Sequence, residues 1–177
     1  MTPRDLARTQ RGVVAGALGA AVLAAALLWF AWGPGARRVP RIDDGAERLG
    51  FALRLDLAVL LCLAVAIGRV ATQRFRSAED IGGSASLSES SAVRQSRAIL
   101  QNTLEQVVLA IPAHLALASV LPPDRMAVLG ALVLLFVAGR IAFAAGYPHG
   151  APGRAFGFVL TFGSTGAAIA GAALLAP

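Results

Sequence analysis

The chain has 177 residues, a hydrophobic fraction of 56% and a formal net charge of +6. Soluble domains contain roughly 45–50% apolar residues, so this composition excludes an ordinary soluble domain and favours an integral membrane protein. The chain has no lysine, and its arginines gather at the ends of apolar blocks. That placement is typical of headgroup anchoring and argues against nucleic-acid binding.

Five apolar blocks predict five membrane-spanning helices. About 20 residues are needed to cross the hydrocarbon as a helix, and each block is long enough. Because backbone inside a bilayer must satisfy its own hydrogen bonds, blocks of this length are helices. We therefore expect an all-α integral membrane helical bundle. The blocks run from Gly12 to Ala36, Leu49 to Val70, Ile99 to Leu121, Met126 to Tyr147 and Ala155 to Pro177.

The first block follows Arg4, Arg8 and Arg11, an arrangement that resembles the start of a signal peptide. Its apolar run is longer than the roughly 7–15 residues of a signal-peptide core, which predicts a retained helix, with a cleaved signal as the alternative. Gly12 and Gly16 have the spacing of a helix-contact motif. In so glycine-rich a chain, chance is the alternative reading of that spacing.

The arginines predict an orientation with the N-terminus in the cytoplasm of a bacterial cell, because cytoplasmic ends of spans carry the excess of basic residues. With five spans, the cytoplasmic side would hold Arg4, Arg8, Arg11, Arg69, Arg74, Arg76, Arg94, Arg97, Arg140 and Arg154. The opposite side would hold Arg37, Arg38, Arg41, Arg48, Arg54 and Arg125.

Three isolated polar residues lie outside the two polar sets described below. Asp56 lies in the second block and should meet a neighbouring helix, because a carboxylate that faces lipid is costly. Cys62 is the single cysteine, which excludes an intrachain disulfide and predicts an inert buried thiol. His149 has no metal-ligand partner at a useful spacing, and the sequence contains no Cys/His metal cluster.

A polar stripe begins the third predicted helix. At 100° per residue, Arg94, Gln101 and Glu105 fall on one face, and Arg97 and Asn102 flank it. Several polar side chains on one face of a membrane helix are expected to point into protein or a cavity. Two interpretations follow, a ligand site and simple interhelical hydrogen bonding between subunits.

A second polar set spans the turn between the last two predicted helices. Arg140, Phe143 and Tyr147 share one helical face, and Arg154 opens the last helix after a short turn with two prolines. The alternative to a site is ordinary, because Arg and Tyr commonly anchor helices at the membrane interface.

The order Gln101-Asn102-x-x-Glu105 and then Arg140-x6-Tyr147-x6-Arg154 resembles the MAPEG family, the membrane-associated proteins in eicosanoid and glutathione metabolism. The resemblance covers residues 49–177 as a four-helix unit, so residues 1–48 would add an N-terminal transmembrane helix and a polar connection. It implies a homotrimer in which glutathione binds between subunits near the cytoplasmic face.

The resemblance also implies roles for individual residues. Asn102 and Glu105 would hold glutathione, with Arg94, Arg97 and Gln101 beside them. Arg140 and Tyr147 would line the same pocket. Arg154 would stabilise the thiolate.

The expected function is a glutathione-dependent transferase or peroxidase that acts on lipophilic electrophiles arriving from the bilayer. The alternative is a non-catalytic lipid-binding or scaffold protein on the same fold. Retention of Arg154 favours the enzyme. Ala98, where family enzymes usually carry an arginine, and Phe158 favour the alternative. Phe143 likewise stands where some members have a polar aromatic residue. We expect a bacterial inner-membrane protein whose active site faces the cytoplasm.

Overall fold

The computed structural model describes residues 2–83 and 89–176. These residues form five long α-helices and two short 3-10 turns, as the composition predicts. The run from Ile81 to Ser88, whose glycine and serine content predicts a flexible loop, lies mostly outside the described residues. The elements are α1 (Pro3–Trp32), η1 (Ala36–Arg38), α2 (Gly45–Phe75), α3 (Ser91–Val120), α4 (Ala127–Gly146), η3 (Tyr147–His149) and α5 (Gly150–Leu175).

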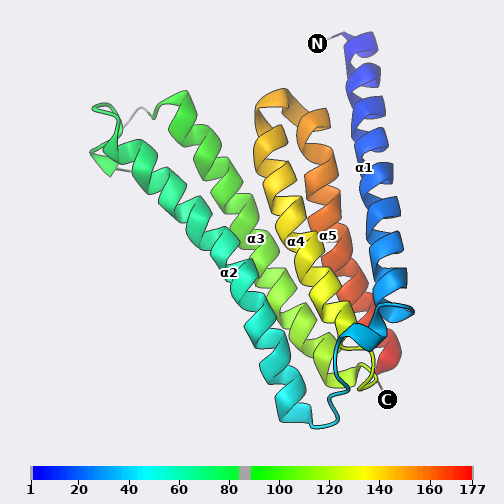
Figure 1. Cartoon of the computed structure of the whole chain (residues 1–177). Coiled ribbons are helices and arrows are strands. Elements are labelled where there is room, and N and C mark those ends of the chain that lie inside the picture. Colours follow the sequence, from blue (N-terminus) through cyan, green and yellow to red (C-terminus); the bar gives the residue numbers. More distant parts are fainter. Residues whose placement is uncertain (1, 84–88, 177) are drawn as a thin grey trace.

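The five helices run side by side, with α2 and α1 at opposite edges of the bundle in Figure 1. The helices α4 and α5 form a hairpin that turns back on itself at η3. Within the bundle, α5 packs against α1, α3 and α4, whereas α2 packs mainly against α3. The N-terminus, the start of α3 and the α4–α5 turn share one end, and the C-terminus lies at the other end.

Most helices extend beyond the apolar blocks at their polar ends. Asp44 caps α2 by accepting a hydrogen bond from the Glu47 amide, so the helix begins before the apolar residues do. Ser90 does the same for α3 through the Val93 amide at 3.3 Å. Hydropathy marks the thickness of the hydrocarbon, and caps mark the ends of a helix, so the two limits differ.

The chain is an integral membrane protein by helix length and composition. Four helical stretches are long and apolar enough to cross a membrane, and the last of them, Ala127–Leu175, contains both arms of the α4–α5 hairpin. At 1.5 Å per residue, even the 20 residues of α4 reach about 30 Å, the thickness of the hydrocarbon. The outward faces of α1 and α2 expose large apolar side chains, including Val22 at 69% and Leu61 at 62%, as expected of surfaces that meet lipid.

A buried Asp–His hydrogen bond joins α2 to α3 within the apolar core. Asp56 Oδ1 and His114 Nδ1 lie 2.7 Å apart, and both side chains are almost fully buried. The prediction that Asp56 meets a neighbouring helix is confirmed, but its partner was not foreseen. Around this pair, Val59 and Phe136 belong to one apolar cluster that links α2, α3 and α4.

Candidate functional site at the α4–α5 turn

A chain of contacts connects four of the predicted site residues across α3, α4 and the start of α5. Asn102 contacts Arg140, which lies on the ring of Phe143, and that ring touches Tyr147. Tyr147 in turn lies under the guanidinium of Arg154. Residues about 50 positions apart in the sequence therefore share one end of the bundle.

Arg140 is the most buried cation in this group, with 5% of its surface exposed. Its Nη1 donates a hydrogen bond to Asn102 Oδ1 at 2.8 Å, and its Nε donates to Thr161 Oγ1 at 3.1 Å. Its Nη2 has no hydrogen-bond partner among the described residues. A buried guanidinium with a free donor is costly, so this atom is suited to an anionic ligand.

Two glycines explain how Arg140 reaches α5. A Cβ on Gly157 would lie 2.6 Å from the carbonyl oxygen of Gly139, a distance that only glycine permits. The backbones of α4 and α5 therefore approach closely, and Thr161, one turn after Gly157, comes within reach of Arg140. Thr161 itself donates to the Gly157 carbonyl at 3.0 Å, which leaves its oxygen free to accept from Arg140.

An aromatic stack continues from Arg140 to Arg154. The Arg140 guanidinium lies 4.6 Å from the ring centre of Phe143, and the Phe143 and Tyr147 rings meet edge to face at 5.5 Å. Arg154 lies 4.9 Å above the Tyr147 ring and is half-buried. Phe158 closes the stack on the α5 side, 6.5 Å from Phe143. Among the described residues, no carboxylate pairs with Arg140 or Arg154.

The rest of the predicted stripe on α3 faces outward in the single chain. Gln101 and Glu105 are exposed, and Gln101 Nε2 donates to Glu105 Oε1 at 3.0 Å. Asn102 is half-buried and turns toward α4 instead. The stripe therefore divides, with Asn102 in the cluster around Arg140 and the other two on a separate face.

Arg94 and Arg97 are not brought into that cluster. Both bind Glu89, which lies just before α3. Arg97 donates a hydrogen bond to the Glu89 carboxylate at 2.8 Å, and Arg94 donates one to the Glu89 carbonyl oxygen at 2.9 Å. The hydrogen bonds from Arg97 and Arg74 hold the pKa of the Glu89 carboxyl below its usual range. These arginines fasten the connection between α2 and α3.

A groove of about 310 Å³ opens between α2, α3 and α4, beside Arg140. Its walls are mostly apolar and include Leu61, Val65 and Ile141, which are also exposed on the outer surface. Cys62 lines the groove and is half-exposed, so the prediction of a buried thiol was only partly right. The groove offers lipophilic molecules a lateral path toward the Arg140 side chain.

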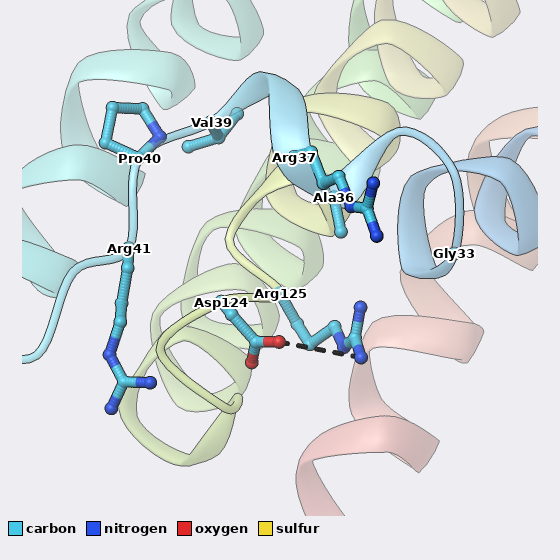
Figure 2. A pocket seen from close by; sticks show the side chains of 8 residues that line it. All are labelled: Gly33, Ala36, Arg37, Val39, Pro40, Arg41, Asp124 and Arg125. Atoms are coloured by element: carbon cyan, nitrogen blue, oxygen red, sulfur yellow. Dashed lines mark ion pairs between the residues drawn. The ribbon is translucent and has the colours of Figure 1, made fainter.

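A second cavity of about 540 Å³ lies at the opposite end of the bundle, between the α1–α2 connection and the α3–α4 turn. Figure 2 shows Arg37, Arg41 and Arg125 around it, with the ion pair between Asp124 and Arg125 marked. Arg41 also has an acidic partner, Asp43, at 2.7 Å. Paired cations at a membrane boundary are typical of anchoring.

The family model of the MAPEG family matches residues 49–174. The chain belongs to the MAPEG family. Its matched part begins within α2 and ends within α5, so α1 lies outside it. Comparisons with curated proteins and with solved structures found no match. Membership fixes the class of molecule as an all-α MAPEG membrane bundle.

Sequence reasoning missed two polar residues that the fold makes important. Thr161 lies in an apolar block without charges, where a hydroxyl usually bonds to its own helix. His114 lies in the apolar part of α3, and only the packing of α2 on α3 shows its partner. Nothing in the spacing along one helix indicates which residue of another helix will meet it.

Proposed function

We propose that this MAPEG protein is a glutathione-dependent transferase or peroxidase that acts on lipophilic electrophiles at the membrane. The observation that carries the proposal is the connected set of Asn102, Arg140, Tyr147 and Arg154, with two guanidiniums that have no acidic partner among the described residues. Glutathione carries two carboxylates and a thiol that must ionise, and both requirements call for unpaired cations.

Arg154 is proposed to stabilise the thiolate. Arginine cannot act as a base, since it stays protonated, but its fixed charge favours the ionised form of a thiol. Lowering a thiol pKa from about 8.5 to about 6.5 needs roughly 2.7 kcal/mol of differential stabilisation. The guanidinium of Arg154 is held on the Tyr147 ring, which fixes its position without neutralising it. The thiolate sulfur would then displace a leaving group from an electrophilic carbon. With a peroxide, it would attack one oxygen and break the O–O bond, releasing an alkoxide that takes up a proton to become an alcohol. The sulfenic acid left on the sulfur would react with a second glutathione to give the disulfide and water.

The remaining predicted residues are proposed to hold the tripeptide. Arg140 presents a free Nη2, and Glu105 supplies a carboxylate for the ammonium group of glutathione. Glu105 and Gln101 lie on an outward face inside the apolar block from Ile99 to Leu121, where contact with lipid would be costly. A second copy of the chain would cover that face, which supports a homotrimer with glutathione between subunits.

Arg94 and Arg97 are proposed to act at the entrance to that pocket. Arg97 is about half exposed and already pairs with Glu89. It would therefore attract an arriving anion by its charge and would not form a fixed contact with it. Arg94 is exposed and engages only the carbonyl of Glu89, which leaves most of its donors free. Arg94 and Arg97 would attract glutathione electrostatically, and this attraction would weaken as the salt concentration rises.

A non-catalytic lipid-binding or scaffold protein is the second candidate, and one observation favours it. Arg140 already satisfies two of its nitrogens with Asn102 and Thr161, so this network also serves to join three helices. The apolar groove beside Arg140 would suit a bound lipid as well as a lipophilic substrate. Titration of glutathione into the detergent-purified protein by calorimetry separates the two, since only the enzyme needs glutathione.

We also propose the orientation and the division of the chain. Residues 1–48 would form the extra helix and its connection, and residues 49–177 the MAPEG-like unit, in a bacterial inner membrane. The α4–α5 turn would face the cytoplasm because the arginine-rich ends lie on that side. A reporter fused after Arg76 should be cytoplasmic and one fused after Pro177 periplasmic. Both reporters on one side would contradict five spans.

A further inference from the structure

The helix α1 lies outside the residues that match the MAPEG family, yet it packs along the back of α5. The contact begins at three glycines on one face of α1: Gly12, Gly16 and Gly19. They are spaced by about one helical turn, so together they form a flat strip of helix surface without side chains, which we call the glycine ridge. The ridge continues into Ala20, which is fully buried against Leu160 of α5 and Leu135 of α4.

The ridge meets the first turns of α5 at backbone distance. A Cβ on Gly12 would lie 3.0 Å from Pro152 Cβ, and one on Gly16 would lie 3.2 Å from the Phe156 amide nitrogen. Both distances are tighter than an ordinary contact, so a larger residue would force α1 and α5 apart. A Cβ on Gly19 would lie 3.8 Å from the Phe156 ring, which is ordinary van der Waals contact.

The contacting residues Pro152 and Phe156 precede and follow Arg154 in the sequence, but they lie on the opposite side of α5 from Arg154. At 100° per residue, Phe156 and Pro152 each point about 160° away from Arg154, in opposite rotational senses, so they lie about 40° apart on the far side of the helix. The side of α5 that carries Arg154 contacts the Tyr147 ring, while the opposite side rests on α1. A displacement of α1 would therefore shift the helix on which Arg154 stands.

The other restraints on the start of α5 come from α4, where Gly139 packs closely against Gly157. His149 occupies the position before the helix and makes no capping hydrogen bond with its side chain. The turn is held on the α4 side by close packing of Gly146 against Gly153. Packing from α1 is thus the restraint on the face away from α4.

We infer that α1 is a positioning helix for the candidate site. Gly12 and Gly16 let α1 support the first two turns of α5, and this support places the Arg154 guanidinium over Tyr147. The assignment of a task to Arg154 rests on the proposed function, whereas the docking of α1 on α5 does not. The inference requires that α1 stays in the mature protein and is not a cleaved signal peptide.

A cross-link tests the docking without any reference to activity. In a Cys62→Ser background, the pair Gly16→Cys and Ala155→Cys should form an intrachain disulfide, because a Cβ at residue 16 lies 3.4 Å from Ala155 Cβ. Mass spectrometry of the linked peptides provides the readout. The matched control pairs Val14→Cys with Ala155→Cys, and Val14 lies on the exposed face of α1. Absence of the Gly16 link, equal linking in the control, or a mature N-terminus after Trp32 would overturn the inference.

Substitutions then test the effect on the site. Gly16→Leu should raise the pKa of the bound glutathione thiol by about one, which lowers the thiolate-to-thiol ratio at neutral pH about tenfold and the thiolate fraction about threefold. The fall should appear in kcat, with KM for glutathione changed by less than about threefold. If α1 only stabilised the fold, the substitution would lower the amount of active protein and leave the thiol pKa unchanged. Gly16→Ala introduces a smaller side chain at the same position. Helix propensity alone would make this variant more stable than the wild type.

Gly68→Leu on α2 is the control, since a Cβ there meets nothing within 4 Å. It should leave the thiol pKa and kcat at their wild-type values. An unchanged thiol pKa and kcat in Gly16→Leu would overturn the positioning role. If the wild-type protein forms no thiolate with glutathione, the proposed function fails, and with it the role of α1 at the site. The cross-link would still report the docking itself.

Discussion

Guanidiniums lie on aromatic rings at both arginine-rich ends of the bundle, as Arg125 does on Trp32, but at one end Arg41 and Arg125 also have acidic partners. At the end opposite the α4–α5 turn, Arg41 pairs with Asp43 at 2.7 Å, and Arg125 lies 3.5 Å from Asp124. At the turn end, Arg140 and Arg154 lie on aromatic rings at 4.6 and 4.9 Å. No acid pairs with these two among the described residues.

The difference separates anchoring charges from charges available to a ligand. The hydrogen bond from Arg41 lowers the pKa of Asp43, as expected of an exposed pair in which each partner neutralises the other. Arg140 instead keeps a buried nitrogen without a partner. Arg97 lies between these two groups, because Glu89 pairs with it while about half of its side chain stays exposed.

The largest expected effect concerns a buried pair. His114→Leu leaves the Asp56 carboxylate buried without its partner and should cost about 3–5 kcal/mol of stability. Unfolding in a graded detergent series measures it. The double variant Asp56→Leu/His114→Leu is the control and should recover most of the loss, since it removes both buried polar partners. Equal stability of the single variant and the wild type would mean that the pair contributes nothing.

Loss of an unpaired cation should act on chemistry more than on stability. Arg154→Ala should reduce turnover of a model aryl halide about 25-fold at neutral pH, because the thiolate fraction falls from about 0.76 at a thiol pKa of about 6.5 to about 0.03 at about 8.5. Glutathione affinity should remain largely intact because other groups hold the carboxylates. Arg154→Lys should fall between, since an ammonium keeps the charge but not the planar donors. Unchanged turnover in Arg154→Ala would remove this residue from the mechanism.

The groups that hold glutathione should show intermediate effects. Asn102→Ala and Glu105→Gln should each weaken glutathione binding by about 1–3 kcal/mol, the usual cost of losing a buried polar partner. Calorimetry measures the affinity, and size-exclusion chromatography checks that the trimer survives. If the variants dissociate the trimer and glutathione never binds, interhelical hydrogen bonding is the correct interpretation.

The smallest effect is expected at the opposite end. Arg41→Gln removes an exposed pair and should leave stability, turnover and glutathione affinity close to their wild-type values. Steady-state assays and thermal unfolding provide the comparison with Arg154→Ala. A loss of turnover here as large as that of Arg154→Ala would erase the distinction between the two ends.

The sequence predicts the helices well because each apolar block must be a helix in a bilayer. It also predicts that Arg140 and Tyr147 share a face, since both belong to α4 and its continuation. It could not predict that Asn102 turns toward Arg140 while Gln101 turns away, because that division depends on how α3 rotates against α4. Close packing at Gly157 decides the contact with α5.

The helix α1 shows the same limit. The Gly12 and Gly16 spacing allowed either a contact motif or chance, and only the position of α5 decides for a contact. Likewise, arginines at the ends of spans look alike in the sequence. The presence of Asp43 beside Arg41, and of the Tyr147 ring beside Arg154, becomes visible only in the fold.

The most direct test of the central claim is a pH titration of glutathione bound to the wild-type protein and to Arg154→Ala, followed by thiolate absorbance in the ultraviolet. The account predicts a bound thiol in the wild type whose pKa lies well below the ordinary value of about 8.5. In Arg154→Ala the pKa should return close to that value. A wild-type pKa equal to that of the free thiol, or the same lowered pKa in both proteins, would contradict it.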